Sequence, residues 1–359
     1  MEIGLGVLRQ LLRSPLSDHR QTGVAGKGKR VGYKSKLTAP VDRAVQVVKA
    51  RYGLQAQVDR VRLGYMSTTL HLRGGGASYL LKVYRSGDVD PEQLVFGAWT
   101  NGYLRRSGIP APELVCARDG AELVVEGENQ FQLWAFVEGQ VYTPGHRAQL
   151  QAAGTLLGRM HRAGKHMSIS TERAWRPMWG AIEGELEETW CGLEDMPALS
   201  GELDRFRGCL EEVRSAVSEA ALGALPACVI HGDYRAQNLL FRKDRIVAVL
   251  DLDGARPAQR LFDTAYAAVF FQAVVAPGPL EVDELRVFLQ AYDREAGLTD
   301  GERALRSAFL KLSLLRGLTL WMRIAYLERV NVRAVDWIGA YLPFLEGVDR
   351  QGQALVERI

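Results

Sequence analysis

Two neighbouring stretches decide the fold of this chain: Val229-Ile-His-Gly-Asp-Tyr-Arg-Ala-Gln-Asn-Leu-Leu-Phe241 and Ile246-Val-Ala-Val-Leu-Asp-Leu-Asp253. They contain an Asp, an Asn and a second Asp in the order Asp233, Asn238, Asp251. A positioned carboxylate can accept the proton of a hydroxyl. Asn and Asp oxygens suit Mg²⁺. The pattern predicts phosphoryl transfer, with Asp233 as the catalytic base and Asn238 and Asp251 as metal ligands.

The flanking residues place these groups in a strand-loop-strand unit. Residues 227–230 form a short apolar run that leads into the loop, and residues 238–241 and 246–250 have the composition of two hairpin strands. Asn238 and Asp251 would then lie at adjacent ends of one hairpin. The alternative is that they are ordinary loop residues, but five matched positions, with His231 and Gly232 included, favour a site.

The motif HGDxxxxN, followed by a strand and an Asp, resembles the aminoglycoside phosphotransferase and choline kinase-like superfamily. Protein kinases carry Arg where Gly232 stands. The chain looks most similar to the spore-coat kinase-like (CotS type) branch, with type II homoserine kinases nearby, from about Val41 to near the C-terminus. The resemblance implies an α+β, bilobal protein kinase-like fold with an antiparallel-sheet N-lobe and a mainly helical C-lobe. It also implies ATP and Mg²⁺ as cofactors.

Charge separates the first 40 residues from the rest of the chain. Residues 1–40 carry eight Lys or Arg and two acidic residues, a net charge of +6, whereas the whole chain carries +3. We expect a disordered basic tail at 1–40, an N-lobe that binds nucleotide at 41–138 and a catalytic, substrate-binding C-lobe at 139–359. A short amphipathic helix in the tail would favour a membrane surface or nucleic acid; a solvated, dispensable tail is the preferred interpretation.

Lys82 lies in the apolar segment Tyr79-Leu-Leu-Lys-Val-Tyr84. A strand lysine is usually just exposed, but kinase-like folds use the third-strand lysine to neutralise the α- and β-phosphates. The resemblance therefore implies that Lys82 contacts ATP. Its usual partner is a helix Glu, and that position falls at Gly97, so either Glu92 serves instead or Lys82 lacks this partner.

Two further segments are expected around the nucleotide. Residues 64–68 would form a phosphate-covering loop in which Ser67 and Thr68 offer hydroxyl and N–H groups. The segment Leu133-Trp-Ala-Phe-Val-Glu-Gly139 resembles the family's hinge, so backbone groups from Ala135 to Val137 would hydrogen-bond adenine. The alternative is a plain buried strand followed by a Gly turn.

Several residues are expected to support the site. The resemblance implies that His231 and Asp263 brace the catalytic loop, although Asp263 could also cap a helix. Asp253 would share a side of an extended segment with Asp251 and could assist the metal through water, or it could equally be a loop acid with a hydrogen-bonding role. Residues 170–205 and the C-terminal helices should select the acceptor.

Three functions remain open from the sequence. The first is transfer of the ATP γ-phosphoryl group to a hydroxyl of a small molecule: a sugar, an amino alcohol or an antibiotic. The alternatives are a protein Ser/Thr kinase and a non-catalytic spore-coat or scaffold protein. Only eleven residues separate Asp251 from Asp263, which leaves little room for a regulated loop and favours the first function.

Four scattered cysteines without a CxxC pair, and no membrane-length apolar run, indicate a cytoplasmic protein, with spore association as an option. No specific nucleic-acid partner is expected, and the oligomeric state is open.

Overall fold

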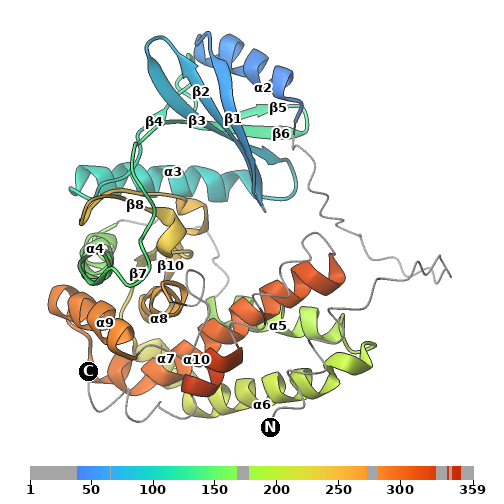
Figure 1. Ribbon diagram of the computed structural model, residues 1–359, viewed down its shortest axis with the longest axis vertical. Helices are drawn as coiled ribbons and strands as arrows, with labels where there is room; N and C mark the ends of the chain where they lie inside the picture. The colour runs from blue at the N-terminus through green and yellow to red at the C-terminus, as the bar shows by residue number, and fades with distance from the viewer. Residues whose placement is uncertain are drawn as a thin grey trace.

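The structure is a computed structural model. It describes residues 39–64, 66–167, 178–272, 282–328, 338 and 342–348. A β-sheet with its helices forms one end of the molecule and a larger helical part forms the other (Figure 1). The predicted tail lies almost wholly outside the described residues. The α+β, bilobal kinase-like fold expected from the sequence is confirmed.

The N-lobe is built on an antiparallel sheet of six strands within the described residues, in the order β1-β2-β3-β6-β4, with β5 also paired to β6. Burial alternates along β2, so that Thr68, Leu70 and Leu72 face the core. The strands are β1 (Gln57–Leu63), β2 (Ser67–Gly74), β3 (Ala77–Arg85), β4 (Leu114–Val115), β5 (Val124–Glu126) and β6 (Asn129–Ala135). Helix α2 (Val41–Val47) and the π-helix η1 (Val48–Tyr52) add Ala44, Val47 and Val48 to the same core.

Helix α3 (Pro91–Arg106) joins the two lobes. The Asp90 carboxylate caps it by accepting the Glu92 backbone N–H at 3.0 Å, and Pro91 occupies the first turn. Helix α3 then packs against the 3₁₀ turn η4 (Leu252–Gly254) of the C-lobe. A Cβ at Gly97 would lie 2.6 Å from the Leu252 carbonyl oxygen, so the helix can approach this closely only because residue 97 is glycine.

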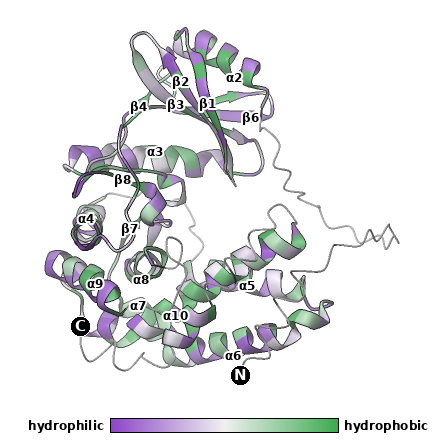
Figure 2. Ribbon diagram, in the orientation of Figure 1, coloured by the Kyte–Doolittle hydropathy of each residue, from purple (hydrophilic) through white to green (hydrophobic). Residues whose placement is uncertain are grey.

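The C-lobe contains a large apolar core that extends over most of its helices. Helix α8 is buried on nearly every side, and α10 begins at a capping box formed by Thr299 and Glu302. The helices are α4 (Arg147–Gly164), α5 (Met178–Cys191), η2 (Pro197–Leu199), α6 (Ser200–Ala216), α7 (Glu219–Ala224), α8 (Leu261–Phe270), α9 (Val282–Ala296), α10 (Asp300–Met322) and η5 (Arg323–Leu327). Hydrophobic residues occur throughout both lobes in Figure 2, consistent with a separate core in each. Among the described helices, none is both long and apolar enough to cross a membrane.

Two small antiparallel pairs carry the residues of the decisive motif. Strand β7 (Ala227–Ile230) pairs with β10 (Arg256–Gln259), and β8 (Leu239–Arg242) pairs with β9 (Arg245–Val249). The Leu250 N–H donates to the Asn238 carbonyl at 2.8 Å, which closes the second hairpin. After Asp251, the chain passes through the turn at residues 252–254 and enters β10 at Arg256. This agrees with the short connection between Asp251 and Asp263 noted in the sequence.

Candidate active site

Asp233 lies in the loop between β7 and the 3₁₀ turn η3 (Ala236–Asn238), and three neighbouring side chains hold its carboxylate. Asn238 Nδ2 donates to Asp233 Oδ2 at 2.8 Å and to its carbonyl at 2.9 Å. The Tyr266 hydroxyl donates to Asp233 Oδ1 at 2.5 Å, and Arg235 Nε lies 3.1 Å from Oδ2. With 27% of its side chain exposed, Asp233 is fixed in orientation but still open to a ligand.

His231 and Asp263 hold this loop in place through hydrogen bonds. The buried Asp263 carboxylate accepts the backbone N–H groups of His231 at 2.5 Å and of Gly232 at 2.8 Å. His231 Nε2 is 2.9 Å from the Leu250 carbonyl, which ties the loop to the strand before Asp251. Asp263 lies in the first turn of α8, where Arg260 is the N-cap, so the position is not the helix cap considered from the sequence. The loop is thereby anchored through its backbone.

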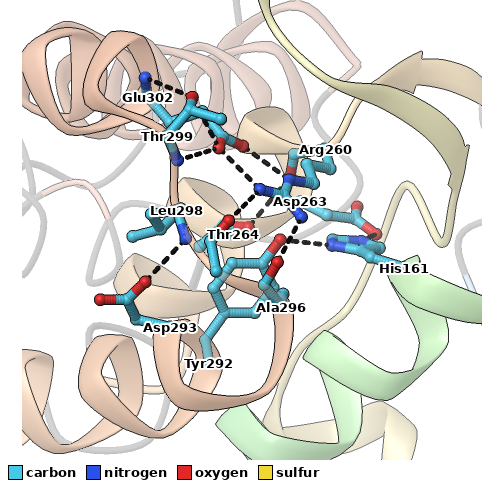
Figure 3. Close-up of polar contacts among 11 residues, drawn as sticks. His161, Arg260, Asp263, Thr264, Tyr292, Asp293, Ala296, Leu298, Thr299 and Glu302 are labelled. Carbon is cyan, nitrogen blue, oxygen red and sulfur yellow. Dashed lines mark hydrogen bonds and ion pairs between the residues drawn. The ribbon is translucent and has the colours of Figure 1, made fainter.

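A buried polar network supports Asp263 in turn (Figure 3). His161 Nε2 lies 3.3 Å from Asp263 Oδ2, and its Nδ1 lies 2.9 Å from the Tyr292 hydroxyl. Burial alone would raise the pKa of Asp263, but the hydrogen bond and charge of His161 and the His231 N–H hold it below its usual value. Asp263 therefore remains a carboxylate that orients the catalytic loop.

Gly232 is required by the geometry of the loop. Its φ of +80° is a left-handed conformation, and a Cβ there would lie 2.3 Å from the Gly254 carbonyl oxygen. The catalytic loop and the turn after Asp251 therefore touch backbone to backbone. This contact brings the two halves of the motif together.

Asp251 and Lys82 meet where the lobes face each other. Lys82 Nζ lies 2.7 Å from Asp251 Oδ1 and 2.9 Å from Asp253 Oδ2. Burial would lower the pKa of Lys82, but the two carboxylates raise it well above its usual value. Burial would also raise the pKa of Asp251, but the Lys82 ammonium overrides that effect and lowers it. Asp251 has a φ of 65°, an uncommon conformation for Asp that is often found at functional sites.

The prediction that Asp251 and Asp253 share one side of an extended segment was wrong, because η4 is a 3₁₀ turn. Both carboxylates nevertheless reach Lys82. Asp253 also accepts the Tyr84 hydroxyl at 2.7 Å, and Gln93 Nε2 donates to the Asp253 carbonyl at 2.8 Å. Burial is the main cause that raises the pKa of Asp253. The Lys82 ammonium lowers this pKa, and the negative charge of the neighbouring Asp251 raises it further. Asp253 is thus tied to both the sheet and α3 of the N-lobe.

Glu92 is exposed in the first turn of α3. The family's helix Glu would fall at residue 97, where Gly97 packs closely against the Leu252 carbonyl and leaves no room for a side chain. Lys82 is paired instead with the two aspartates of the C-lobe. The role of Glu92 as a substitute partner stays a prediction.

The two segments expected around the nucleotide, residues 64–68 and 133–139, differ in part from the sequence-based expectation. Strand β2 already begins at Ser67, so Ser67 and Thr68 are strand residues and the expected loop at 64–68 is shorter. A tight turn explains this, since the Gly64 N–H donates to the Ser67 carbonyl at 2.8 Å. In the hinge, the Ala135 N–H donates to the Glu113 carbonyl at 2.8 Å. Phosphate contacts from Ser67 and Thr68, and adenine contacts from Ala135 and Val137, stay predictions.

The structure adds two hydroxyls that sequence reasoning missed. Tyr266, on α8, contacts the Asp233 carboxylate, and Tyr84, on β3, contacts Asp253. The spacing in the sequence gives a signal for both residues. Tyr266 is three residues after Asp263 on one helix, and Tyr84 is two residues after Lys82 on one strand face. Neither spacing indicates by itself that the hydroxyl reaches a carboxylate.

Comparison with known proteins agrees with this geometry. Residues 57–306 match the model of the phosphotransferase enzyme family, described as APH. The chain belongs to this family. A homoserine kinase of Zymomonas mobilis is 28% identical over 266 residues, which cover 73% of this chain and 75% of that protein. A homoserine kinase of Bradyrhizobium diazoefficiens is 27% identical over 276 residues, with 75% of each chain covered. The chain is accordingly a kinase of the small-molecule type.

Solved structures share the fold at lower identity. A microcompartment-associated aminopropanol kinase has a TM-score of 0.72 and 18% identity, covering 89% of this chain and 99% of that one. An amicoumacin kinase, solved with AMP-PNP and Ca²⁺, has a TM-score of 0.67 and 17% identity, covering 88% and 94%. The spore-coat kinase-like branch suggested by the sequence is not shown by these comparisons, which bring out homoserine kinases instead.

Proposed function

We propose that the protein transfers the γ-phosphoryl group of ATP to a hydroxyl of a small molecule, with Asp233 as the catalytic base. The observation that carries this assignment is the convergence of Asp233, Asn238, Asp251 and Lys82 at the junction of the lobes. Asn238 is in direct contact with Asp233, and the backbone of the Asp233 loop abuts the turn that follows Asp251.

The reaction needs three things from the chain. Asp233 orients the acceptor hydroxyl and takes its proton as the oxygen bonds to the γ-phosphorus and the bond to ADP breaks. Lys82, which remains charged, would contact the α- and β-phosphates. Tyr266 and Asn238 fix the Asp233 carboxylate, so little reorganisation is needed when the acceptor arrives.

Magnesium fits the donor set of this site. The described residues contain no cluster of three or more His, Cys, Asp or Glu that could hold a metal ion. Mg²⁺, however, is commonly held by one or two protein oxygens together with substrate phosphates. Asp251 and the Asn238 amide would supply those oxygens. The ion would neutralise charge on the β- and γ-phosphates when bound.

For the acceptor, three chemistries are represented among the similar proteins: a hydroxy amino acid for the homoserine kinases, an amino alcohol for the aminopropanol kinase and an antibiotic for the amicoumacin kinase. We favour the small-molecule acceptor over a protein substrate because β10 follows Asp251 almost directly, without an activation segment between them. A cytoplasmic location stays a prediction from cysteine usage.

The test combines nucleotide binding with turnover. Mg-ATP should raise the melting temperature of the full-length protein, because a ligand that binds only the folded state stabilises it. A panel of hydroxylated amino acids, amino alcohols and sugars should then yield ADP with at least one class. A protein with no thermal response to any magnesium nucleotide would overturn the proposal.

A further inference from the structure

Two carboxylates of the C-lobe share the Lys82 ammonium. Lys82 Nζ lies 2.7 Å from Asp251 Oδ1 and 2.9 Å from Asp253 Oδ2. Asp251 is also the proposed magnesium ligand, so its negative charge would be divided between the metal and Lys82 once nucleotide is bound. Asp253 is thus the carboxylate that can hold Lys82 both before and after the metal binds.

The Asp253 carboxylate is fixed against strand β3 by two donors. Its Oδ2 atom accepts the Lys82 ammonium at 2.9 Å and the hydroxyl of the fully buried Tyr84 at 2.7 Å. Lys82 and Tyr84 are two residues apart on one strand, so their side chains lie on the same face of the sheet. The Tyr84 hydroxyl therefore holds the carboxylate beside Lys82 independently of the ammonium itself.

The backbone that carries Asp253 is fixed to helix α3. Gln93 Nε2 donates to the carbonyls of both Asp253 and Ala255 at 2.8 Å. One turn further along α3, a Cβ at Gly97 would lie 2.6 Å from the Leu252 carbonyl oxygen, so helix and turn are in close contact. Helix α3 supplies no carboxylate at residue 97, but it fixes the position of the turn that supplies one.

We infer that Asp253 is the positioning residue of Lys82: its carboxylate holds the ammonium where the α- and β-phosphates of ATP bind, in the role that a helix glutamate at residue 97 would have. The inference rests on the proposed function, since it concerns the lysine assigned there to the phosphates. Asp253 acts through Lys82 and is not itself proposed to touch the nucleotide.

Two other roles for Asp253 have to be separated from this one: assistance to the metal through water, and a structural tie between the lobes. The chain offers a matched control in Asp59 of β1. Its Oδ2 lies 3.0 Å from His71 Nδ1 and accepts from Arg73 Nη2 at 3.1 Å, so it also joins two side chains that are two residues apart on one strand. Its side chain is 34% exposed, against 26% for Asp253.

The experiment measures the Kd of three ligands by calorimetry on the full-length protein: adenosine, ADP in EDTA and Mg-ATP. D253N should weaken binding of ADP in EDTA and of Mg-ATP roughly 10-fold, as K82M should, because the phosphate contact of Lys82 is misplaced. Adenosine should bind as to the wild type, since it has no phosphate. D253N should add nothing in the K82M background, because both changes remove one interaction, and D59N should match the wild type.

The sign of the effect separates position from charge. Removal of a negative charge would by itself strengthen the binding of an anionic ligand. Weaker phosphate binding in D253N therefore supports positioning, whereas tighter binding, or the same Kd values as in D59N, would overturn it. Where D253N does not fold, D253E takes its place against D59E, because its charge is kept but displaced by one methylene.

The remaining outcomes distinguish the alternatives. A loss confined to Mg-ATP, or one that adds to the loss in K82M, would assign Asp253 to the metal, and an equal loss of adenosine binding would make it structural; each overturns the inference and leaves the kinase assignment standing. A wild type that binds none of the three ligands would instead overturn the proposed function.

Discussion

At the scale of single residues, the site depends on how each charge is partnered. Asp233 is held by an amide, a hydroxyl and a guanidinium, whereas Asp251 and Asp253 share the Lys82 ammonium. The Lys82 ammonium stabilises the charged form of Asp251 and lowers its pKa against the effect of burial. Asp233 and Asp251 therefore lie in different surroundings, in keeping with the different roles proposed for them.

The first prediction concerns those two roles. Asp233→Asn and Asp251→Asn should each lower kcat by roughly a thousandfold or more, because the proton acceptor or a metal ligand is lost. Asp251→Asn should in addition raise the Mg²⁺ concentration needed for half-maximal activity, whereas Asp233→Asn should not. Steady-state kinetics over a magnesium titration provides the check, and full activity in either variant would reject its assignment.

The second prediction concerns the partner of Lys82. Lys82→Met should weaken the thermal shift produced by Mg-ATP, because the variant loses a phosphate contact. Asp253→Asn should weaken it too, since Asp253 bonds Lys82 at 2.9 Å, whereas Glu92→Ala in the exposed first turn of α3 should leave turnover unchanged. Equal losses in Glu92→Ala and Lys82→Met would instead establish Glu92 as the partner.

A third prediction follows from the lowered pKa of Asp263. Its stabilising contribution is present above the unfolded pKa of about 3.9 and is lost as pH falls through the lower folded value. Urea unfolding of the wild type should therefore show stability falling below about pH 4. Asp263→Asn should be less stable at pH 7, with a flatter slope below pH 4; parallel curves for the two proteins would contradict this.

At the scale of elements, the ends of helices position the catalytic loop. Arg260 precedes α8 and forms two hydrogen bonds of 2.7 Å to Glu302 in the first turn of α10, while its other donors reach the carbonyls of Ala296 and Gly297 (Figure 3). Glu302 also closes the capping box with Thr299. One buried pair thus fixes the start of two helices and, through α8, the position of Asp263.

The fourth prediction tests this pair. Arg260→Met leaves the fully buried Glu302 without its cation and should destabilise the protein by about 3–5 kcal/mol, and the double variant Arg260→Met/Glu302→Leu should be less affected than the single one. The control is Asp283→Ala, which removes an exposed pair with Arg286 and should change stability by less than about 0.5 kcal/mol. Chemical denaturation measures all three, and a single variant as stable as the double one would contradict the prediction.

At the scale of the whole molecule, the N-lobe core reaches into the segment predicted to be a basic tail. Residues 1–38 lie outside the described residues, but Ala39 is buried in the N-lobe core and the Pro40 carbonyl accepts the Ala44 N–H at 3.1 Å. Ala39 and Pro40 therefore contribute to the N-lobe core and to the first turn of α2. The tail boundary at residue 40 stays a prediction.

The fifth prediction is that deleting residues 1–38 leaves ATP turnover and the melting temperature unchanged, because the segment is polar, glycine-rich and separately charged. Deleting residues 1–40 should lower the melting temperature slightly, since a core residue and a helix cap are lost. Unfolding or inactivation of the shorter deletion would make the tail part of the catalytic unit.

The sequence by itself determined the order of Asp233, Asn238 and Asp251, because a short motif is a local property of the chain, and the resemblance carried by that motif implied the kinase-like fold with its antiparallel N-lobe. It also located the departure at Gly97. Only the tertiary structure showed which side chains lie beside Lys82: Asp251 and Asp253 come from the other lobe, and Asp253 is 171 residues away. The contacts of Tyr266 with Asp233 and with Arg316 depend in the same way on how α8 packs against the catalytic loop and α10. Such contacts join residues far apart in the chain, and no local periodicity encodes the distance between them.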